Sequence, residues 1–327
     1  MDLSIIIVNY KTPQLILDCL ASVYRETNQH SFEIIIVDNH SEDNSKEIIT
    51  GKFPGVKWIQ LDKNSGFATG NNEGIKKAEG DFILLLNSDT IILEGAIDKC
   101  ISFLKSQTDS SVAVLGCKLL NSDRSLQHSS FPKRIWPGLK TTVLQNILLG
   151  KIRSSVFGKI DTPLDNGSLH GTIHFADAIG GSFILFDRKI LSSAGLLDSD
   201  FFMYFEEIEW ANRITSAGYK IIYYNKANII HLHGASSPNM QVKKQSIFSQ
   251  GLFILKVYGK AGYLFYLFMN YLNIISGYIL YPLLSSDSKQ NFRNRVKLFE
   301  PMSRHHLETL FYYGKRTSSG KKPLKAS

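Results

Sequence analysis

Apolar and polar residues come in blocks along the first third of the chain, and the blocks have the lengths of strands and helices. The short apolar runs are typical of strands buried on both faces of a sheet. They cover residues 3–8, 33–37, 56–61 and 82–86. Segments with apolar residues at helical spacing lie between them, at 13–24, in a short helix ending at 49, and at 70–78. This order predicts an α/β fold with a mostly parallel sheet flanked by helices.

The later part of the chain is less regular. We expect a helix at 96–104, a strand at 112–115, strand-like order at 178–186, a helix ending at 217 and a strand at 220–224. Residues 121–175 show no clear pattern, and loops of that length in compact domains are usually functional or mobile. This stretch is a candidate for a lid or for a loop on the acceptor side.

The first four predicted strands are each followed by a polar loop. The loops read Asn9-Tyr10-Lys11-Thr12, Asp38-Asn39-His40-Ser41, Asn64-Ser65-Gly66-Phe67 and Asn87-Ser88-Asp89. Because open α/β sheets bind their ligands beyond the carboxyl ends of the strands, we expect a nucleotide site there. Asp89 can hold a divalent metal against a diphosphate, because hard cations take oxygen ligands. Its alternative role is to open a turn or to cap the next helix.

Further polar positions are candidates for chemistry. Asp38 can accept a hydrogen bond from the imide N–H of uracil or thymine, or it can form an Asx turn. The acidic run 206–209 follows the aromatic stretch 201–205. A carboxylate desolvated by aromatic walls has a raised pKa and suits general-base work near neutral pH. Acidic residues also favour helix N-termini for electrostatic reasons alone. His231 is part of an H-x-H pair, which is only weakly indicative of a metal.

Composition narrows the range of binding partners and the cellular compartment expected for the protein. The chain has 37 basic and 29 acidic residues, and its formal charge of +8 favours anionic partners such as nucleotide-sugars, nucleic acids or acidic lipid surfaces. The three cysteines lie in predicted helices or strands, as buried thiols of a reducing compartment do. Met1-Asp2 leads directly into a strand, so we expect the N-terminal part in the cytoplasm. Neither G-x-G-x-x-G nor a P-loop signature follows a strand, which argues against dehydrogenases and P-loop enzymes.

The motifs together resemble a known family. They occur in the order V-N-Y, V-D-N-x-S, N-x-G-F-x-x-G-N-N-x-G, L-L-N-S-D, G-G-S-F, F-F-M-Y-F-E-E-I-E and H-x-H-G-x-S. Over roughly residues 3–240 this combination resembles the family-2 glycosyltransferases, and it is most similar to their bacterial rhamnosyltransferase-like branch. The resemblance implies a glycosyltransferase A fold, with a nucleotide-binding sheet, and a metal-dependent, inverting transfer from a nucleotide-activated sugar.

The resemblance also implies roles for individual residues. Asn9 and Asp38 would contact the nucleobase. Asn64, Gly66 and Asn72 would line the nucleotide pocket. Gly180 and Gly181 would let the backbone approach the donor sugar. Asp89 and His231 would hold a divalent metal, Mg²⁺ or Mn²⁺.

The chain departs from the family pattern at the base and at the metal motif. The family's base is the second acid of an E-D pair, and that position here is Glu207. A Glu in place of Asp lengthens the arm by a methylene, so Glu206 stays an alternative base. Asn87 stands where the metal motif has an Asp, which suggests a metal that arrives with the nucleotide.

The C-terminal part differs in character from the rest. Residues 261–284 carry no charged side chain and would span about 36 Å as a helix, enough to cross a bilayer core. Polar or small residues recur on one stripe of that helix. They are Lys256, Lys260, Tyr263, Tyr266, Asn270, Asn273 and Gly277. The stripe favours a helix in the membrane interface, with packing on the catalytic domain and a true span as alternatives.

We therefore expect a catalytic domain at 1–240, a helical and membrane-proximal segment at 241–312 and a basic tail at 313–327. The predicted function is sugar transfer, with rhamnose among the candidates, from a dTDP-, UDP- or GDP-linked donor to a cell-surface glycan or a lipid-linked acceptor. We expect this to occur at the inner face of the cytoplasmic membrane, without a nucleic-acid partner. A sugar nucleotidyltransferase and a catalytically degenerate nucleotide-sugar-binding protein are the rival classes.

Overall fold

The computed structural model describes residues 1–131, 171–232 and 239–280, together with positions 282, 289, 290, 293 and 296. Contacts between residues divide the chain into two compact units, Met1–Lys133 with Pro163–Val242 and Arg134–Thr162 with Lys243–Ser327. Most of the stretch at 121–175 for which we expected a lid or an acceptor-side loop, and the whole predicted basic tail, lie outside the described residues.

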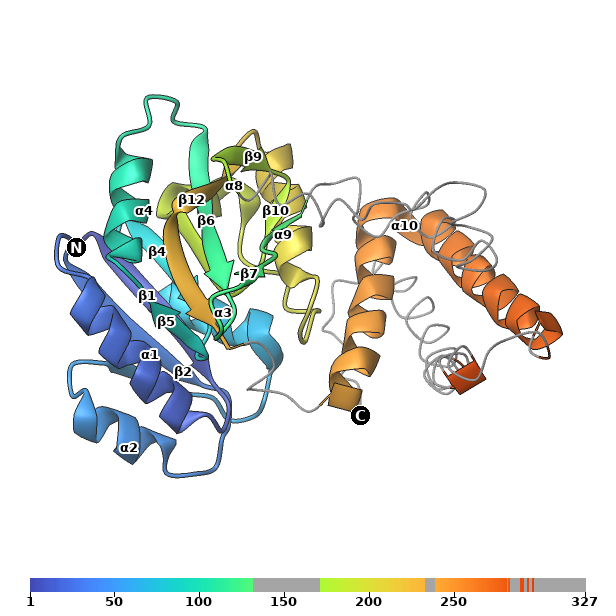
Figure 1. The fold of residues 1–327 in the computed structure, drawn as a ribbon, viewed down its shortest axis with the longest axis horizontal. Coiled ribbons are helices and arrows are strands. Elements are labelled where there is room, and N and C mark those ends of the chain that lie inside the picture. The colour runs from blue at the N-terminus through green and yellow to red at the C-terminus, as the bar shows by residue number, and fades with distance from the viewer. Residues whose placement is uncertain are drawn as a thin grey trace. The chain divides into compact units, whose positions relative to one another are not determined.

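The first unit is built on a mixed sheet with the strand order β3-β2-β1-β4-β11-β6-β12-β5 (Figure 1). The strands β3, β2, β1 and β4 are parallel, whereas β11 runs antiparallel to both β4 and β6. The bounds are β1 Leu3–Asn9, β2 Phe32–Asp38, β3 Lys57–Gln60, β4 Phe82–Leu86, β5 Thr90–Ile92, β6 Val112–Leu120, β7 Leu126–Gln127, β8 Ser130–Phe131, β9 His174–Ala176, β10 Ala178–Ile179, β11 Phe183–Asp187 and β12 Lys220–His231. The expected α/β architecture is confirmed, with its parallel half at the N-terminal strands.

Helices cover both faces of this sheet because successive residues of a strand point to opposite sides. On one face, Ile5 and Ile7 of β1 belong to the same apolar cluster as Leu20 and Ile101 of the helices α1 and α4. On the other face, Ile6 and Val8 lie against the glycines of α3. The helices and the short 3-10 turn are α1 Pro13–Glu26, α2 Ser45–Lys52, α3 Gly66–Lys77, α4 Ala96–Lys105, η3 Arg188–Ile190, α8 Leu191–Ala194, α9 Glu206–Ser216 and α10 Asn239–Leu280.

The register of the strands brings distant residues to one edge of the sheet. Asn9 at the end of β1 lies opposite Asp38 at the end of β2. The antiparallel β11 begins where β4 ends, with Phe183 opposite Leu86. His231 at the end of β12 lies opposite Thr90 of β5. The polar loops predicted from the sequence therefore do gather at the carboxyl edge of the parallel strands.

Most of the described part of the second unit is α10. Gly259, at φ 69° and ψ −173°, is not helical and divides α10 into two straight helices (Figure 1). In the second of these, Tyr263, Tyr266 and Asn270 are buried. Gln245–Leu272 is long and apolar enough to cross a membrane, with a mean hydropathy of 1.3, but 44% of its most apolar window is buried. Length and composition alone therefore do not decide whether it crosses one.

A glycine at the opposite edge of the sheet gives a test of the fold. A Cβ built on Gly80 would lie 2.5 Å from the backbone carbon of Leu3, and the Gly80 N–H donates to Ser4 Oγ at 2.8 Å. Gly80→Ala therefore forces β1 to move, and we expect it to lower the free energy of unfolding by about 1–3 kcal/mol. Gly51→Ala in α2 is the control. Its Cβ would meet nothing within 4 Å, so denaturant titration should show unchanged or slightly higher stability.

Candidate active site

A buried acid and a buried histidine meet beyond the ends of β4 and β12. Asp89 and His231 are 3% and 8% exposed, and Oδ1 of Asp89 lies 3.4 Å from Nε2 of His231. The strand pairing holds this contact, since the Leu232 N–H donates to the Asp89 carbonyl at 2.9 Å. Gln127 Oε1 lies 2.7 Å from Nδ1 of His231, and Ser182 Oγ lies 3.3 Å from either ring nitrogen. Gln127 of β7 and Ser182, which directly precedes β11, thus orient the imidazole.

The carboxylate of Asp89 contacts no other side chain among the described residues. A buried carboxylate normally accepts several hydrogen bonds, because desolvation without them is costly. Asp89 therefore keeps acceptor sites available, as a metal ligand would.

Asp38, in contrast, accepts hydrogen bonds at both of its carboxylate oxygens. Its Oδ1 accepts from Asn9 Nδ2 at 2.6 Å and from Ser41 Oγ at 2.5 Å. Its Oδ2 accepts from the Ser41 backbone N–H at 2.9 Å and from Gln60 Nε2 at 2.7 Å. Burial raises the pKa of Asp38, but the hydrogen bonds from Ser41, Gln60 and Asn9 outweigh it, and the net pKa is lowered. Asn9 and Asp38 thus form one rigid, ionised network at the ends of β1 and β2.

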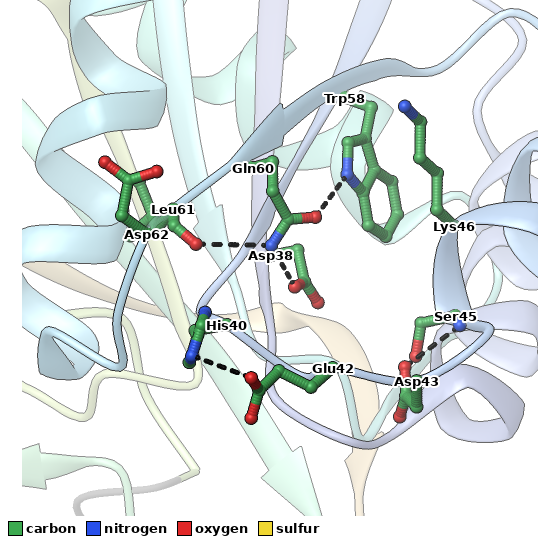
Figure 2. Close-up of a pocket in the computed structure, with 10 residues that line it drawn as sticks. All are labelled: Asp38, His40, Glu42, Asp43, Ser45, Lys46, Trp58, Gln60, Leu61 and Asp62. Carbon is green, nitrogen blue, oxygen red and sulfur yellow. Dashed lines mark hydrogen bonds and ion pairs between the residues drawn. The ribbon is translucent and has the colours of Figure 1, made fainter.

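This network borders a cavity of about 400 Å³ between the loop after β2 and strand β3 (Figure 2). Trp58 forms one side, and its Nε1 donates to Gln60 Oε1 at 3.2 Å. Gln60 lies between Trp58 and Asp38 in Figure 2, while His40 and Glu42 face each other across the loop. The cavity has an aromatic wall and polar groups, which is a suitable environment for a planar heterocycle.

The other predicted nucleotide residues mostly contact the protein itself. Asn64 Oδ1 accepts from the Gly66 N–H at 3.2 Å. Asn72 is 6% exposed, and its side chain bonds the backbone of Leu197. Gly66 starts α3 with a left-handed φ of 84°. The prediction that these residues line a nucleotide pocket stays a prediction.

Gly180 and Gly181 precede β11 and are half-buried. A Cβ on either would have only ordinary contacts, the nearest at 3.6 Å for Gly180 and 3.7 Å for Gly181. No atom of the described residues therefore requires glycine at these two positions, which leaves room for the predicted approach of a donor sugar.

Two acids begin α9, and neither has a salt-bridge partner among the described residues. Glu206 and Glu207 each have a buried Oε2 without a hydrogen-bond partner. Burial and the neighbouring Glu207 raise the pKa of Glu206 well above its usual value. Burial likewise raises the pKa of Glu207 to about 7, against the opposing effect of hydrogen bonds from backbone N–H groups of the first helical turn. A carboxyl group with this pKa can accept a proton near neutral pH.

The next acid on the same helix is different. Glu209 is also buried, but both its oxygens are bound by Arg213, with Nε to Oε1 at 2.8 Å and Nη2 to Oε2 at 2.7 Å. Arg213 Nη2 also donates to the Leu196 carbonyl at 2.9 Å. Glu209 therefore has a structural role, which separates it from the pair at 206–207.

The loop before α9 and the start of α3 are in direct contact. The Phe67 N–H donates to the Phe202 carbonyl at 2.7 Å, and Phe202 lies a few residues before Glu206 and Glu207. A Cβ built on Gly181, the neighbour of Ser182, would lie 3.7 Å from the Phe67 ring. The acid pair and the Asp89–His231 pair both lie in the first unit.

The donor set fits a divalent metal that takes further ligands from its substrate. Among the described residues, no cluster of three or more His, Cys, Asp or Glu side chains is placed to hold a metal. One buried carboxylate with open acceptor sites and one imidazole nitrogen beside it match the O and N ligands such ions accept. Diphosphate oxygens and water would have to complete the coordination.

Part of the chain is similar to a known protein family. Residues 4–161 match the family model described as "Glycosyl transferase family 2". This match covers just under half of the chain, and it identifies the N-terminal part as similar to the family 2 glycosyltransferases.

Two curated relatives of the chain are named as a polysaccharide synthase and as a hexosyltransferase of glycan biosynthesis. The poly-beta-1,6-N-acetyl-D-glucosamine synthase of Staphylococcus epidermidis RP62A is 28% identical over 228 residues, 69% of this chain and 48% of that protein. The low-salt glycan biosynthesis hexosyltransferase Agl10 of Haloferax volcanii is 26% identical over 234 residues, 70% of this chain and 67% of that protein. The chain thus spans about half the length of the first of these relatives.

A solved structure supports the fold. The mannosyltransferase PcManGT of Pyrobaculum calidifontis, in complex with GDP-Man and Mn²⁺, superposes with a TM-score of 0.54 at 12% identity, covering 98% of this chain and 88% of that one. The glycosyltransferase A type of fold expected from the motifs is confirmed.

Several residues of the first unit were not predicted as functional. Ser182 and Gln127 orient His231, and Asn39 holds the loop before α3 by accepting from the Ser65 N–H at 2.8 Å. Ser182 and Asn39 lie inside motifs already recognised. Gln127 comes from the stretch that showed no pattern, so no local signal could have identified it.

The raised pKa of Glu207 gives a prediction about stability that needs no activity assay. In the unfolded chain the Glu207 carboxyl loses its proton above about pH 4.5, whereas in the folded protein it keeps the proton up to a pKa of about 7. The wild type therefore loses stability across that window, and Glu207→Gln should not. We expect the stability gain of Glu207→Gln over the wild type to grow between pH 5 and pH 7.5 in thermal unfolding.

Glu209→Gln is the matched control, because it breaks the ion pair with Arg213 and should destabilise the protein at both pH values. A pH-independent difference between Glu207→Gln and the wild type would show that the Glu207 carboxyl is not held protonated.

Proposed function

We propose that the chain is an inverting glycosyltransferase that moves a sugar from a nucleotide-sugar to a hydroxyl group of a cell-envelope glycan or lipid-linked acceptor. The observation that carries this proposal is Glu207, a largely buried carboxyl group with a raised pKa and an Oε2 that has no hydrogen-bond partner among the described residues. It lies at the start of α9, in the same compact unit as Asp89 and His231. A transferase of this kind needs a base on the acceptor side and a charge-stabilising group on the diphosphate side.

Each predicted site residue has a separate role in the proposed reaction. Glu207 takes the proton of the acceptor hydroxyl as that oxygen attacks the anomeric carbon from the face opposite the leaving diphosphate. Glu206 is the alternative base. Gly180 and Gly181 leave space for the donor sugar, and the Asn9–Asp38 network, beside the cavity at Trp58, receives the nucleobase.

A divalent metal, Mg²⁺ or Mn²⁺, would supply Lewis-acid stabilisation of the charge that develops on the leaving diphosphate. Asp89 and His231 would hold it, and Asn87, whose N–H donates to the Ser182 carbonyl at 3.1 Å, contributes no charge there. The mannosyltransferase structure with GDP-Man and Mn²⁺ supports a metal of this class. The donor remains one of the dTDP-, UDP- and GDP-linked sugars, with rhamnose among those expected.

Release of nucleoside diphosphate from UDP-GlcNAc, UDP-glucose, GDP-mannose and dTDP-rhamnose, with Mn²⁺ or Mg²⁺, tests the proposal. We expect one donor to be turned over. Glu207→Gln should lower turnover by about 10²–10⁴-fold while leaving nucleotide affinity unchanged. Asp89→Asn should lower turnover and also abolish the metal dependence of nucleotide binding measured by calorimetry.

Asp109→Asn, a surface acid paired with Lys220, is the control and should behave as the wild type. Failure of every donor to bind would favour the degenerate alternative. Near-normal turnover by Glu207→Gln would exclude Glu207 as the base and leave Glu206.

We further propose that the second half of α10 lies in the membrane interface. Leu264, Phe268, Ile275 and Ile279 are 55%, 57%, 54% and 72% exposed. The spacings of four, seven and four residues place them on one face of the helix. Three residues of the predicted stripe, Tyr263, Tyr266 and Asn270, are buried instead. A helix that is more apolar outside than inside suits contact with lipid.

Flotation with vesicles of phosphatidylethanolamine and phosphatidylglycerol tests this attachment. The wild type should float with the vesicles and be released by carbonate at high pH. Leu264→Glu combined with Phe268→Glu should stay in solution, whereas Ile48→Glu, at an exposed apolar residue of α2, should still float. Resistance to carbonate would instead indicate a transmembrane span.

A further inference from the structure

The loop that leads to the acid pair is held by helix α3. The loop runs from Leu197 to Phe205, directly before α9. The Phe67 N–H in the first turn of α3 donates to the Phe202 carbonyl at 2.7 Å. One turn further along α3, the side chain of Asn72 reaches the other end of the same loop. These contacts join two elements that are more than a hundred residues apart in the sequence.

Asn72 binds the loop through both ends of its amide. Its Nδ2 donates to the Leu197 carbonyl at 2.8 Å, and its Oδ1 accepts from the Leu197 N–H at 3.1 Å. The side chain is 6% exposed, so both bonds are shielded from water. A buried amide with both groups satisfied by one backbone residue fixes that residue in position and orientation.

Gly66 packs closely against the backbone of Phe202, toward the C-terminal end of the loop. A Cβ on Gly66 would lie 2.2 Å from the Phe202 carbonyl oxygen. At φ 84° this residue also has a backbone conformation that side chains disfavour. Glycine is therefore required here by the loop before α9.

The other side of the loop is held by α9 itself. Trp210 Nε1 donates to the Gly195 carbonyl at 2.9 Å, and Arg213 binds the Leu196 carbonyl. Between these anchors and the acid pair lie Tyr204 and Phe205, with left-handed φ values of 70° and 69°. Such a turn costs energy and persists only where its surroundings hold it.

We propose that Asn72 and Gly66 are positioning residues that hold the loop at 197–205 and thereby place Glu207 against the acceptor hydroxyl. Asn72 and Gly66 thus serve to position the base Glu207, rather than to contact the nucleotide. The catalytic part of the proposal rests on Glu207 being the base of the proposed transferase. The mechanical part, the restraint of the loop by α3, does not.

The mechanical part is tested by hydrogen–deuterium exchange. Asn72→Leu keeps the size of the side chain and removes both bonds to Leu197, and we expect at least about tenfold faster exchange across 197–207. Asn71→Leu is the matched control. Asn71 is 1% exposed and donates to the Phe67 carbonyl of its own helix at 3.0 Å, with no bond to the loop. Equal exchange at 197–207 in both variants would overturn the proposal.

The catalytic part is tested with the donor that the wild type turns over among UDP-GlcNAc, UDP-glucose, GDP-mannose and dTDP-rhamnose. Asn72→Leu should lower kcat by about 10–100-fold, because a displacement of the order of 1 Å has that effect. The Kd of the matching nucleoside diphosphate with Mn²⁺ should change by less than about twofold. Asn71→Leu should leave both unchanged. A large loss of nucleotide affinity with unchanged kcat would instead place Asn72 in the nucleotide pocket and overturn the proposal.

Gly66→Ala gives an independent route if Asn72→Leu does not fold. Its control is Gly218→Ala, which has a similar left-handed φ of 89° but would place its Cβ within 4 Å of nothing. We expect faster exchange at 197–207 and a lower kcat only for Gly66→Ala, and equal behaviour of the two would contradict the proposal. If the wild type turns over no donor, the transferase proposal fails, and the exchange experiment alone still decides whether α3 restrains the loop.

Discussion

The antiparallel return of β11 against the end of β4 is the constraint on which the site depends. It places Ser182 beside Asn87, and through β6 it sets the position of β12, whose last residue His231 then faces Thr90 of β5. A shift of one residue in either pairing would turn His231 to the opposite face of the sheet. The contact between Asp89 and His231 is therefore a consequence of strand register, and no loop needs to fold around a metal to create it.

The buried acids of this domain are distinguished by what binds them rather than by where they lie in the sequence. Asp38 is surrounded by donors, and Glu209 is held by Arg213. Among the described residues, the Asp89 carboxylate has one ion-pair partner and the Glu207 Oε2 has no hydrogen-bond partner. Fully bound carboxylates rigidify the scaffold, whereas incompletely bound ones cost stability and so need a reason to persist. The substrate contacts proposed for Asp89 and Glu207 would supply such a reason.

Local patterns predicted the strands of the parallel half to within a residue or two. Three of them, β1, β2 and β4, are buried runs of β-branched and other apolar residues, whereas β3 is partly exposed. They missed the start of α3, predicted at residue 70 and found at Gly66, since glycine and asparagine are weak helix formers. The partners of Asp89 and the role of Asn72 could not be predicted either. Both depend on contacts between residues more than a hundred positions apart, for which a single sequence carries no periodic signal.

The surroundings of Glu207 have two opposite effects on its proton. Backbone N–H groups at residues 205, 207 and 208 favour its charged form, as a helix N-terminus does for any anion. Burial has the larger effect and favours the neutral form, so the pKa is raised to about 7. Because Oε2 has no hydrogen-bond partner among the described residues, it is available to accept a proton. Glu209 on the same helix differs, since Arg213 binds both of its oxygens. The left-handed turn before α9 is what puts the carboxyl at the helix start where this balance is reached.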